Sequence, residues 1–198
     1  MDNTLMNNLL SLIKHRRSIR RYTSQQIPRE ALAQIIEAGL HAPNAGGGQR
    51  SMIVGIHNAE LAEQIGKMNL AGFNRANLAG GHVSKEQPSI IDNPSLKSGF
   101  YGAPTVCAIF CQERFLYSIP DAFCIAENMV LMATSLGIAS CIVARGEDTF
   151  RSEYGKTLLE QWNVPEGFVC RAFVLLGYVD GEYPSAKTIR EGRSVIVK

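Results

Sequence analysis

One stretch near the middle of the chain limits its possible folds more than any other. Residues 105–111 are apolar almost throughout, a pattern typical of a β-strand that is buried on both faces. The next long segment, residues 121–136, has helical spacing with apolar or small side chains on nearly every side, which predicts a central helix or one in a subunit interface. A sheet layered with helices buries both segments.

The other elements follow from hydrophobic periodicity and from the positions of Gly and Pro. Further helices are predicted at residues 4–14, 28–40, 58–68 and 149–162, and further strands at residues 51–56, 140–144 and 170–178, with a β-like end at 194–197. His41 is expected to cap the C-terminus of one helix, and Asp121 the N-terminus of the long one. No repeat or linker divides the chain, which predicts one domain over residues 1–198, an α+β or α/β sandwich with the sheet in the middle.

Composition argues against several classes of protein. The 198 residues carry a formal net charge of only +2, whereas a nucleic-acid-binding protein is usually more basic. No apolar run approaches the ~20 residues of a membrane span. The five cysteines are odd in number and lack CxxC spacing, which favours reduced, buried thiols over disulfides or a metal site. With no signal peptide visible, a cytoplasmic location is expected.

Positive charge is concentrated in residues 14–21, KHRRSIRR, and a second basic group lies in the tail. Arg is a planar, permanently charged donor whose geometry matches the oxygen atoms of a phosphate. The cluster follows a predicted helix, so its cations could instead cap that helix or be solvated. Arg16, Arg17 and Arg20, placed around Ser18, are too dense for capping alone, which favours a site for a small phosphate-bearing ligand.

A Gly-rich loop, APNAGGGQ at residues 42–49, can approach a flat ligand closely with its backbone. It lies between a helix and a strand, the wrong order for a dinucleotide-binding turn, and the chain has no P-loop and no nucleophile elbow. The four histidines lack metal-ligand spacing. An anion site and a Gly loop without an evident acid, base or nucleophile favour an enzyme whose cofactor carries the chemistry. We therefore expect the cluster and the loop to belong to one cofactor site.

Residues 69–100 form the least regular part of the sequence, rich in Asn, Gly and Pro. Irregular segments of this length are uncommon in compact domains and are often functional. Two hypotheses stay open for this segment, a mobile cover over the site and a variable surface excursion.

Several short motifs, in order along nearly the whole chain, carry a family resemblance. They are RRSIRRY at residues 16–22, APNAGGGQ at 42–49, FYGAP at 100–104, GIASC at 137–141 and REGR at 190–193. These resemble the RRSxRxF/Y motif, the APSxxNxQ loop, the yGAP element, the GLGSC strand entry and the basic tail of the nitroreductase family of flavoproteins. The resemblance implies an α+β fold, a three-layer sandwich whose central mixed, mainly antiparallel sheet is flanked by helices.

The resemblance also implies an FMN-binding homodimer with the flavin at the subunit interface. In such proteins Arg16, Ser18 and Arg20 would hold phosphate and ribityl oxygens. Arg17 would lie near the flavin ring, while Lys14 and Arg21 would be solvated. A basic residue of the tail would complete the phosphate clamp, and the candidates are Arg190, Arg193 and Lys187.

Further flavin contacts come from three other parts of the chain under the same resemblance. Residues of the Gly loop would reach the flavin bound mainly by the other chain, Asn69 would lie beside the ring, and one stretch would run along the ring with a backbone N–H facing N5. The implied loop residues are Pro43, Asn44, Ala45 and Gln49, and the implied ring residues are Ile142, Val143 and Ala144.

The loop departs from the family pattern at three points. Asn44 stands where the motif has Ser, and Gly47 where it has Asn, so the expected contacts there are backbone ones. Arg50 and Ser51 stand where Pro-Trp often follows the Gln, which removes an aromatic anchor and adds a charge.

The implied activity is that of an FMN-dependent oxidoreductase. NADH or NADPH would give hydride to flavin N5, and a nitroaromatic, a quinone or a similar conjugated acceptor would then take the electrons in ping-pong order. Two other hypotheses stay open from the residues: a flavin-storing or flavin-sensing protein without significant turnover, and an unrelated anion-binding domain.

Overall fold

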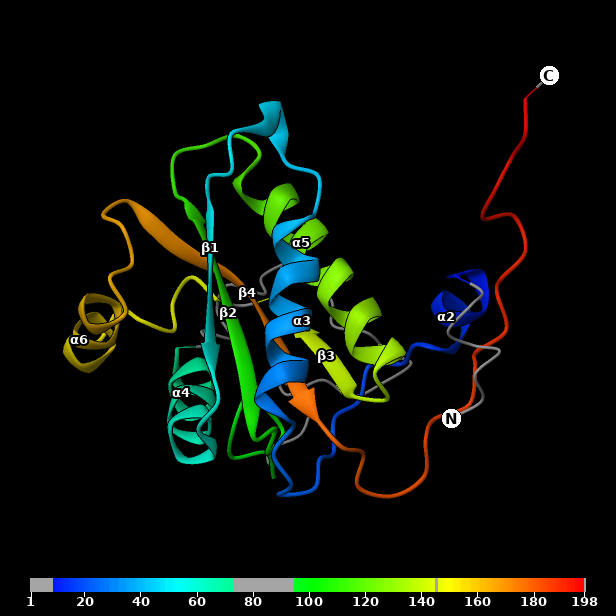
Figure 1. Ribbon diagram of the computed structural model, residues 1–198, viewed down its shortest axis with the longest axis horizontal. Helices are drawn as coiled ribbons and strands as arrows, with labels where there is room; N and C mark the ends of the chain where they lie inside the picture. The colour runs from blue at the N-terminus through cyan, green and yellow to red at the C-terminus, as the bar shows by residue number, and fades with distance from the viewer. Residues whose placement is uncertain (1–8, 73–94, 145, 198) are drawn as a thin grey trace.

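The computed structural model describes residues 9–72, 95–144 and 146–197. Its centre is a four-stranded sheet with the strand order β1-β2-β4-β3 (Figure 1). The strands are β1 (Ser51–Ile56), β2 (Thr105–Gln112), β3 (Ala139–Val143) and β4 (Phe168–Gly177), and each neighbouring pair is antiparallel. A single parallel bridge joins Ser18 to Ser140 at the start of β3, so the pairing is mixed and mainly antiparallel, as the resemblance implied.

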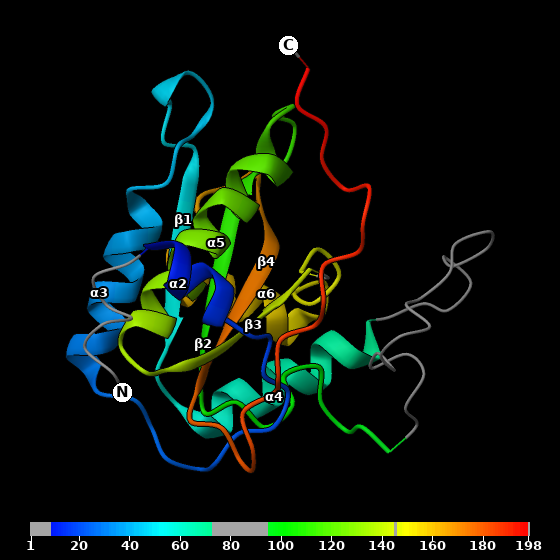
Figure 2. The same cartoon turned by 90° about the vertical axis from the view of Figure 1, so that its right-hand side faces the viewer.

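Helices cover both faces of the sheet and make the three layers (Figures 1 and 2). One face carries α3 (Arg29–Leu40) and α5 (Ser118–Ser135), and the other carries α4 (Ala59–Ala71) and α6 (Glu153–Gln161). The short helix α2 (Leu9–His15) contacts α5. These layers confirm the predicted α+β class.

The central strand β2 divides the hydrophobic core into two clusters. Side chains at alternate positions, Cys107, Ile109 and Cys111, pack with α3 and α5, whereas the intervening side chains face α4 and α6. Residues 105–111 are all buried, so the prediction of a strand covered on both faces is confirmed. Each cluster removes a continuous apolar surface from water, which is the main driving force for the fold.

Close packing of α3 against α5 depends on one small residue. A Cβ atom at Gly39 would lie 2.8 Å from Cγ of Met129, so only Gly fits without a shift of the methionine. Met129 is fully buried in the cluster below both helices. The long helix is therefore packed centrally, which is one of the two positions predicted for it; a position in a subunit interface stays a prediction.

Strand β4 contains a β-bulge. Ile109 pairs with Ala172 and Phe110 with Cys170, so Arg171 has no partner on β2. Its side chain leaves the sheet and binds three different segments. The Nε atom donates to Ser118 Oγ at 2.8 Å, Nη1 pairs with Glu147, and Nη2 donates to the backbone oxygen of Glu113 at 2.9 Å.

Some sequence predictions of element ends were wrong. Asp121 does not cap α5, which begins at Ser118 after Tyr117; instead its carboxylate accepts the backbone N–H of Ala45 at 3.1 Å. The helix predicted over 149–162 is shorter, because the Ser152 hydroxyl accepts the Gly155 N–H and starts α6 there. Residues 194–197 form no strand and are strongly exposed.

Other ends agree with the prediction or lie outside the described residues. The backbone N–H of His41 caps α3 by donating to the Glu37 oxygen at 3.2 Å. The start of the helix predicted over 4–14 and most of the irregular segment 69–100 fall outside the described residues, although α4 extends to Ala71. Across the described ranges, none of the helices combines the length and the hydropathy needed to cross a bilayer.

Candidate functional site

The basic cluster lies in a segment that joins α2 to α3 and is hydrogen-bonded to the end of the sheet. Ile19 donates its backbone N–H to the Ser140 oxygen in β3 at 2.9 Å, and Thr23 donates to the Tyr178 oxygen just after β4 at 2.9 Å. An antiparallel bridge between Tyr22 and Val179 completes the attachment. The backbone of the cluster is therefore fixed by the strands beside it rather than by α2 alone.

A cavity of about 750 Å³ opens over this segment. Five basic side chains line it, and none of its described lining residues is acidic. Those basic side chains are Lys14, Arg16, Arg17, Arg20 and Lys187. Because like charges repel, such a group of cations favours an anionic ligand in their midst.

Arg16 and Arg20 have weak contacts within the protein. Nη1 of Arg16 lies 3.4 Å from Ser18 Oγ, and Nη1 of Arg20 lies 3.5 Å from the Ser18 backbone oxygen, both at the outer limit of a hydrogen bond. Neither guanidinium forms an ion pair with any carboxylate in the part of the chain that the structure describes. Their donors are thus largely available for a ligand.

Arg17 caps a helix with one nitrogen and leaves another nitrogen without a partner, so it fits both alternatives that the sequence left open, helix capping and ligand binding. Its Nη1 caps the C-terminus of α2 by donating to the backbone oxygens of Lys14, His15 and Arg16 at 2.6, 2.9 and 2.7 Å. Its Nε is buried without a hydrogen-bond partner among the described residues. A buried donor left unpaired costs free energy, so a ligand oxygen at this position is stabilising.

A second buried polar atom without a partner in the described structure is the hydroxyl of Ser140, which lies where β3 meets Ser18. The neighbouring thiol of Cys141 shows the balance of forces here. Burial raises its pKa, while the positive charges of Arg20 and Arg16 act in the opposite direction. Cys141 is therefore a neutral thiol near the cations and does not supply the missing anion.

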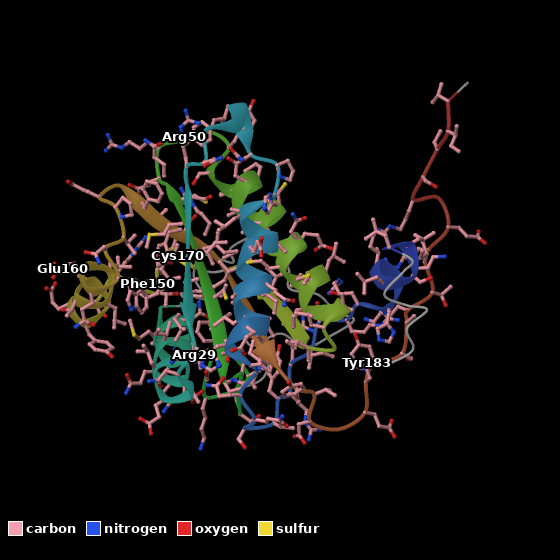
Figure 3. All side chains as sticks on the ribbon, viewed as in Figure 1. Arg29, Arg50, Phe150, Glu160, Cys170 and Tyr183 are labelled. Carbon is pink, nitrogen blue, oxygen red and sulfur yellow. The ribbon has the colours of Figure 1, made fainter. Side chains whose placement is uncertain are left out.

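Tyr183 was missed by the sequence analysis. Its hydroxyl accepts the backbone N–H of Arg17 at 3.1 Å and donates to the His15 oxygen at 3.2 Å. Its ring, labelled in Figure 3, belongs to the start of the tail. It stacks on the ring of His15 with the ring centroids 4.9 Å apart. An aromatic residue in an otherwise polar tail was the only signal in the sequence. By these contacts Tyr183 holds the start of the tail against the cluster.

The tail supplies one of the three predicted basic residues to the cavity. Lys187 lines it beside residues 184–186, whereas Arg190 and Arg193 lie further along the exposed tail. Arg21, expected to be solvated, is 76% exposed and pairs with Asp180 at 3.2 Å. Lys14, for which the same was expected, is also exposed, and it lines the cavity as well.

The Gly loop lies apart from this cavity within one chain. It forms a short 3-10 turn, η1 (Ala45–Gly47), between α3 and β1 at the top of Figure 1, whereas the cluster lies near α2. Pro43, Asn44, Ala45 and Gln49 are all absent from the lining of the cavity. One chain therefore does not bring the loop to the cavity, and the expectation that the loop residues reach a flavin bound mainly by the other chain stays a prediction.

The loop is held by hydrogen bonds at its ends and open at its centre. Asn44 Oδ1 accepts the Gln49 N–H at 2.8 Å, and Asp121 holds Ala45. Gly46 and Gly47 both have φ of +62°, which other residues rarely adopt. Apart from their own chain neighbours, no atom of the described residues lies within 4 Å of a Cβ built at either. After the loop, the Arg50 guanidinium lies 4.8 Å from the centre of the Phe115 ring.

The other predicted flavin contacts also lie outside the lining of the cavity. Asn69, in the last turn of α4, is buried and donates from Nδ2 to Thr149 Oγ1 at 3.0 Å. Ile142 and Val143 end β3, and Ala144 is exposed just after it. Their predicted role beside a flavin ring stays a prediction.

Neither a disulfide nor a metal site is present in the described structure. All five cysteines are free; four of them are buried, as predicted, whereas Cys124 is exposed. Within residues 9–72, 95–144 and 146–197, no group of three or more His, Cys, Asp or Glu side chains is arranged to hold a metal ion.

Comparison with known proteins gives consistent results. A sequence model of the Nitroreductase family matches residues 13–178. A protein of Archaeoglobus fulgidus that carries the provisional name NADH dehydrogenase/NAD(P)H nitroreductase is 28% identical over 179 residues, covering 89% of this chain and 88% of that protein. The structure of a nitroreductase with bound FMN from Bacteroides fragilis superposes with a TM-score of 0.80 at 29% identity, covering 97% of this chain and 100% of that one. One from Desulfitobacterium hafniense, with a TM-score of 0.78 and 24% identity over the whole of both chains, shares the fold.

Proposed function

Because the chain belongs to the nitroreductase family, we propose that it binds FMN and acts as an NAD(P)H-dependent oxidoreductase on conjugated acceptors. The solved relative from Bacteroides fragilis binds FMN, and the Archaeoglobus relative is named for NAD(P)H and nitro compounds. Nitroaromatics and quinones are the acceptors we propose. We also propose a cytoplasmic location, which the five free cysteines support.

The observation that carries the proposal is the cavity of about 750 Å³ with five cations and no acidic residue among its described lining. The residues present fit FMN. Most N–H donors of Arg16 and Arg20 form no hydrogen bond within the protein, and the buried Nε of Arg17 lacks an acceptor. The phosphate of FMN would satisfy the donors of Arg16 and Arg20 together, and the Nε of Arg17 would be left for an oxygen of the flavin ring. Lys187, held over the cluster by the tail, is the tail cation we assign to the same phosphate.

We further propose that the complete site is shared between two copies of the chain. The separation of the Gly loop from the cavity within one chain supports this, since the loop can meet a ligand of the cluster only across an interface. The open space around Gly46 and Gly47 leaves their backbone accessible for such a contact. Helix α2, beside the cluster, exposes three large apolar side chains, those of Leu9, Leu10 and Ile13. Their exposure is consistent with an interface near the cluster.

When bound, FMN would supply the hydride chemistry that the protein side chains lack. Arg17 would place a positive charge near the ring and so stabilise negative charge there in a partly dry site. Ile142, Val143 and Ala144 would support the ring, and Asn69 would lie near its edge. The residues of this chain thus bind and orient, and none is assigned as an acid or a base.

The test is a spectroscopic one on the purified full-length protein. We expect a yellow protein whose flavin absorbance bleaches on anaerobic mixing with NADH or NADPH and recovers when a quinone or a nitroaromatic is added. A protein that stays colourless after incubation with FMN would refute the cofactor assignment. A yellow protein that neither donor bleaches would favour the flavin-storage alternative.

A complementation experiment tests the shared site. Arg16→Ala damages the cluster, and Gly47→Val damages the loop, because valine does not tolerate a φ of +62°. Each variant alone should bind FMN poorly. A refolded mixture of the two should regain a fraction of the sites, because a hybrid dimer has one site with both parts intact. No recovery in hybrids verified by mass spectrometry would mean that the parts act within one chain.

A further inference from the structure

A second cavity, of about 480 Å³, lies at the opposite edge of the sheet. It is bounded by the first turns of α3, the end of strand β1, the start of α4 and the residue after α6, and we call it the edge pocket. Strand β1 is the outer strand in the order β1-β2-β4-β3, so the pocket and the basic cluster are separated by the width of the sheet (Figure 1). Its volume is within the range of pockets for small organic ligands.

The walls of the edge pocket are mainly apolar and come from both halves of the core. Leu32 and Ile36 of α3 belong to one hydrophobic cluster, whereas Leu61 and Trp162 pack against the other. Trp162 is fixed by an edge-to-face contact with Phe150, their ring centroids 5.7 Å apart. At Gly55 an added Cβ would lie 3.0 Å from Cδ1 of Ile36, so the wall formed by α3 packs directly against the backbone of β1. These walls suit a compact apolar or aromatic body.

One permanent charge faces this apolar space. Arg29, in the first turn of α3 and labelled in Figure 3, lines the pocket with an exposed side chain, which forms no ion pair or hydrogen bond with another described side chain. No acidic side chain is among the described lining residues. His57 is fixed by a 2.7 Å bond to the Ile27 backbone oxygen, which requires the proton on Nε2 and leaves Nδ1 as an acceptor in the neutral ring. The pocket therefore offers a single cation above an apolar floor.

We propose that the edge pocket binds a small monocarboxylic acid, with its carboxylate on Arg29 and its apolar body against Leu32, Ile36 and Trp162. A guanidinium binds a carboxylate through two parallel hydrogen bonds. A phosphate dianion fits less well, because the pocket supplies one cation where the basic cluster supplies five. This site is independent of the proposed flavin site, since the two share no lining residue.

The protein carries its own reporter for this site. The sequence has one tryptophan, Trp162, and it lines the edge pocket. We would titrate the full-length protein, saturated with FMN, with three ligands of one body: 3-cyclohexylpropanoate, 3-cyclohexylpropan-1-ol and 3-cyclohexylpropylamine. None of them absorbs where tryptophan is excited. The proposal expects a saturable change in Trp162 fluorescence with the acid, binding about tenfold weaker with the alcohol, and none with the amine.

Two pairs of variants test the charged part and the apolar part of the site separately. Arg29→Gln should weaken binding of the acid about tenfold and leave binding of the alcohol unchanged. The matched control Arg114→Gln removes an exposed arginine outside the pocket and should change neither. Ala33, exposed at the mouth of the pocket, gives the steric pair: Ala33→Phe should abolish binding of both ligands, and Ala33→Ser should preserve it.

Clear outcomes would overturn the proposal. Equal affinities for acid, alcohol and amine would exclude recognition by Arg29. No saturable fluorescence change with the acid, or unchanged binding in Ala33→Phe, would exclude the pocket itself. Flavin binding and reduction should be unaffected by Arg29→Gln, so failure of this inference and failure of the proposed function give different results.

Discussion

Arg171 differs from Arg16 and Arg20 in how many hydrogen bonds its guanidinium forms within the protein. Arg171 is nearly buried, with 10% of its side chain exposed, and its three nitrogens bind Ser118, Glu147 and the backbone of Glu113. Arg16 and Arg20 have only long contacts to Ser18. The guanidinium of Arg171 is satisfied within the fold, whereas those of Arg16 and Arg20 are not.

We propose that this difference separates an arginine that serves stability from arginines that serve binding. A buried charge is tolerated only when it is paired and fully hydrogen-bonded, as at Arg171. The cluster collects five cations around one cavity without an acidic partner in its described lining, which costs stability through repulsion until an anion binds. Variants of the two groups should therefore affect different measurements.

The largest effect is expected for Arg171→Met. This change leaves Glu147, Ser118 and the Glu113 oxygen without their donor, so we expect the free energy of unfolding to fall by about 2–3 kcal/mol. Urea denaturation measures it. The control is Arg151→Met, because Arg151 pairs with Asp148 at 2.6 Å but is 75% exposed, and exposed pairs contribute little. Equal losses in the two variants would remove the distinction.

Arg20→Ala should have its effect on ligand affinity. We expect FMN binding to weaken by about 1.5–3 kcal/mol, the typical value of a hydrogen bond to a charged group, with the stability of the ligand-free protein unchanged or slightly raised. Fluorescence titration of the ligand-free protein with FMN measures the dissociation constant. Arg114→Ala is the control. If Arg20→Ala instead destabilised the ligand-free protein as much as Arg171→Met, the cluster would be structural.

Tyr183→Phe should have a smaller and local effect. It removes the hydroxyl that accepts from the Arg17 N–H and donates to His15, while the stack on His15 is kept. The lost bonds correspond to about 0.5–1.5 kcal/mol, so amide exchange at Arg17 should become about two- to tenfold faster. Hydrogen-exchange NMR measures this rate. Tyr154→Phe removes a hydroxyl bonded to Gln64 and should leave the Arg17 rate unchanged.

The smallest effect is expected for Arg21→Gln. Arg21 is 76% exposed and pairs with Asp180, itself 53% exposed, so the pair should contribute no more than about 0.5 kcal/mol to stability. FMN affinity should also stay within about twofold, because Arg21 does not line the cavity. A large change in affinity measured by the same titration would extend the binding group beyond the cavity.

The sequence predicted those parts of the fold that depend on local patterns. Strand β1 was placed at its observed residues 51–56, and residues 105–111 nearly cover β2, because continuous apolar runs leave few alternatives. Asp121 was misplaced because an acidic residue before an apolar helix resembles a cap, and its true partner, Ala45, is far away in the chain. The bulge at Arg171 could not be predicted, because the prediction treated residues 170–178 as a regular strand, and a regular strand contains no extra residue.

The candidate site, like the fold, was predicted where a local pattern marks it and missed where its residues are brought together by distant contacts. The density of Arg16, Arg17 and Arg20 identified the cluster, and the structure adds a cavity around them. Tyr183 and Ser140 were missed because their importance arises from contacts with residues distant in sequence. The Gly loop was recognised, but its distance from the cluster is a property of the folded chain that no local pattern encodes.

The bulge in β4 also has a consequence for insertions and deletions. Cys170 and Ala172 already face opposite sides of the sheet, as neighbouring residues of a regular strand do, so β4 would keep its alternation if Arg171 were deleted. The strand is therefore one residue longer than its pairing with β2 requires. A homologue lacking this residue could keep the same sheet with an uninterrupted ladder. What it would lose is the tie from β4 to the segments that contain Ser118, Glu147 and Glu113.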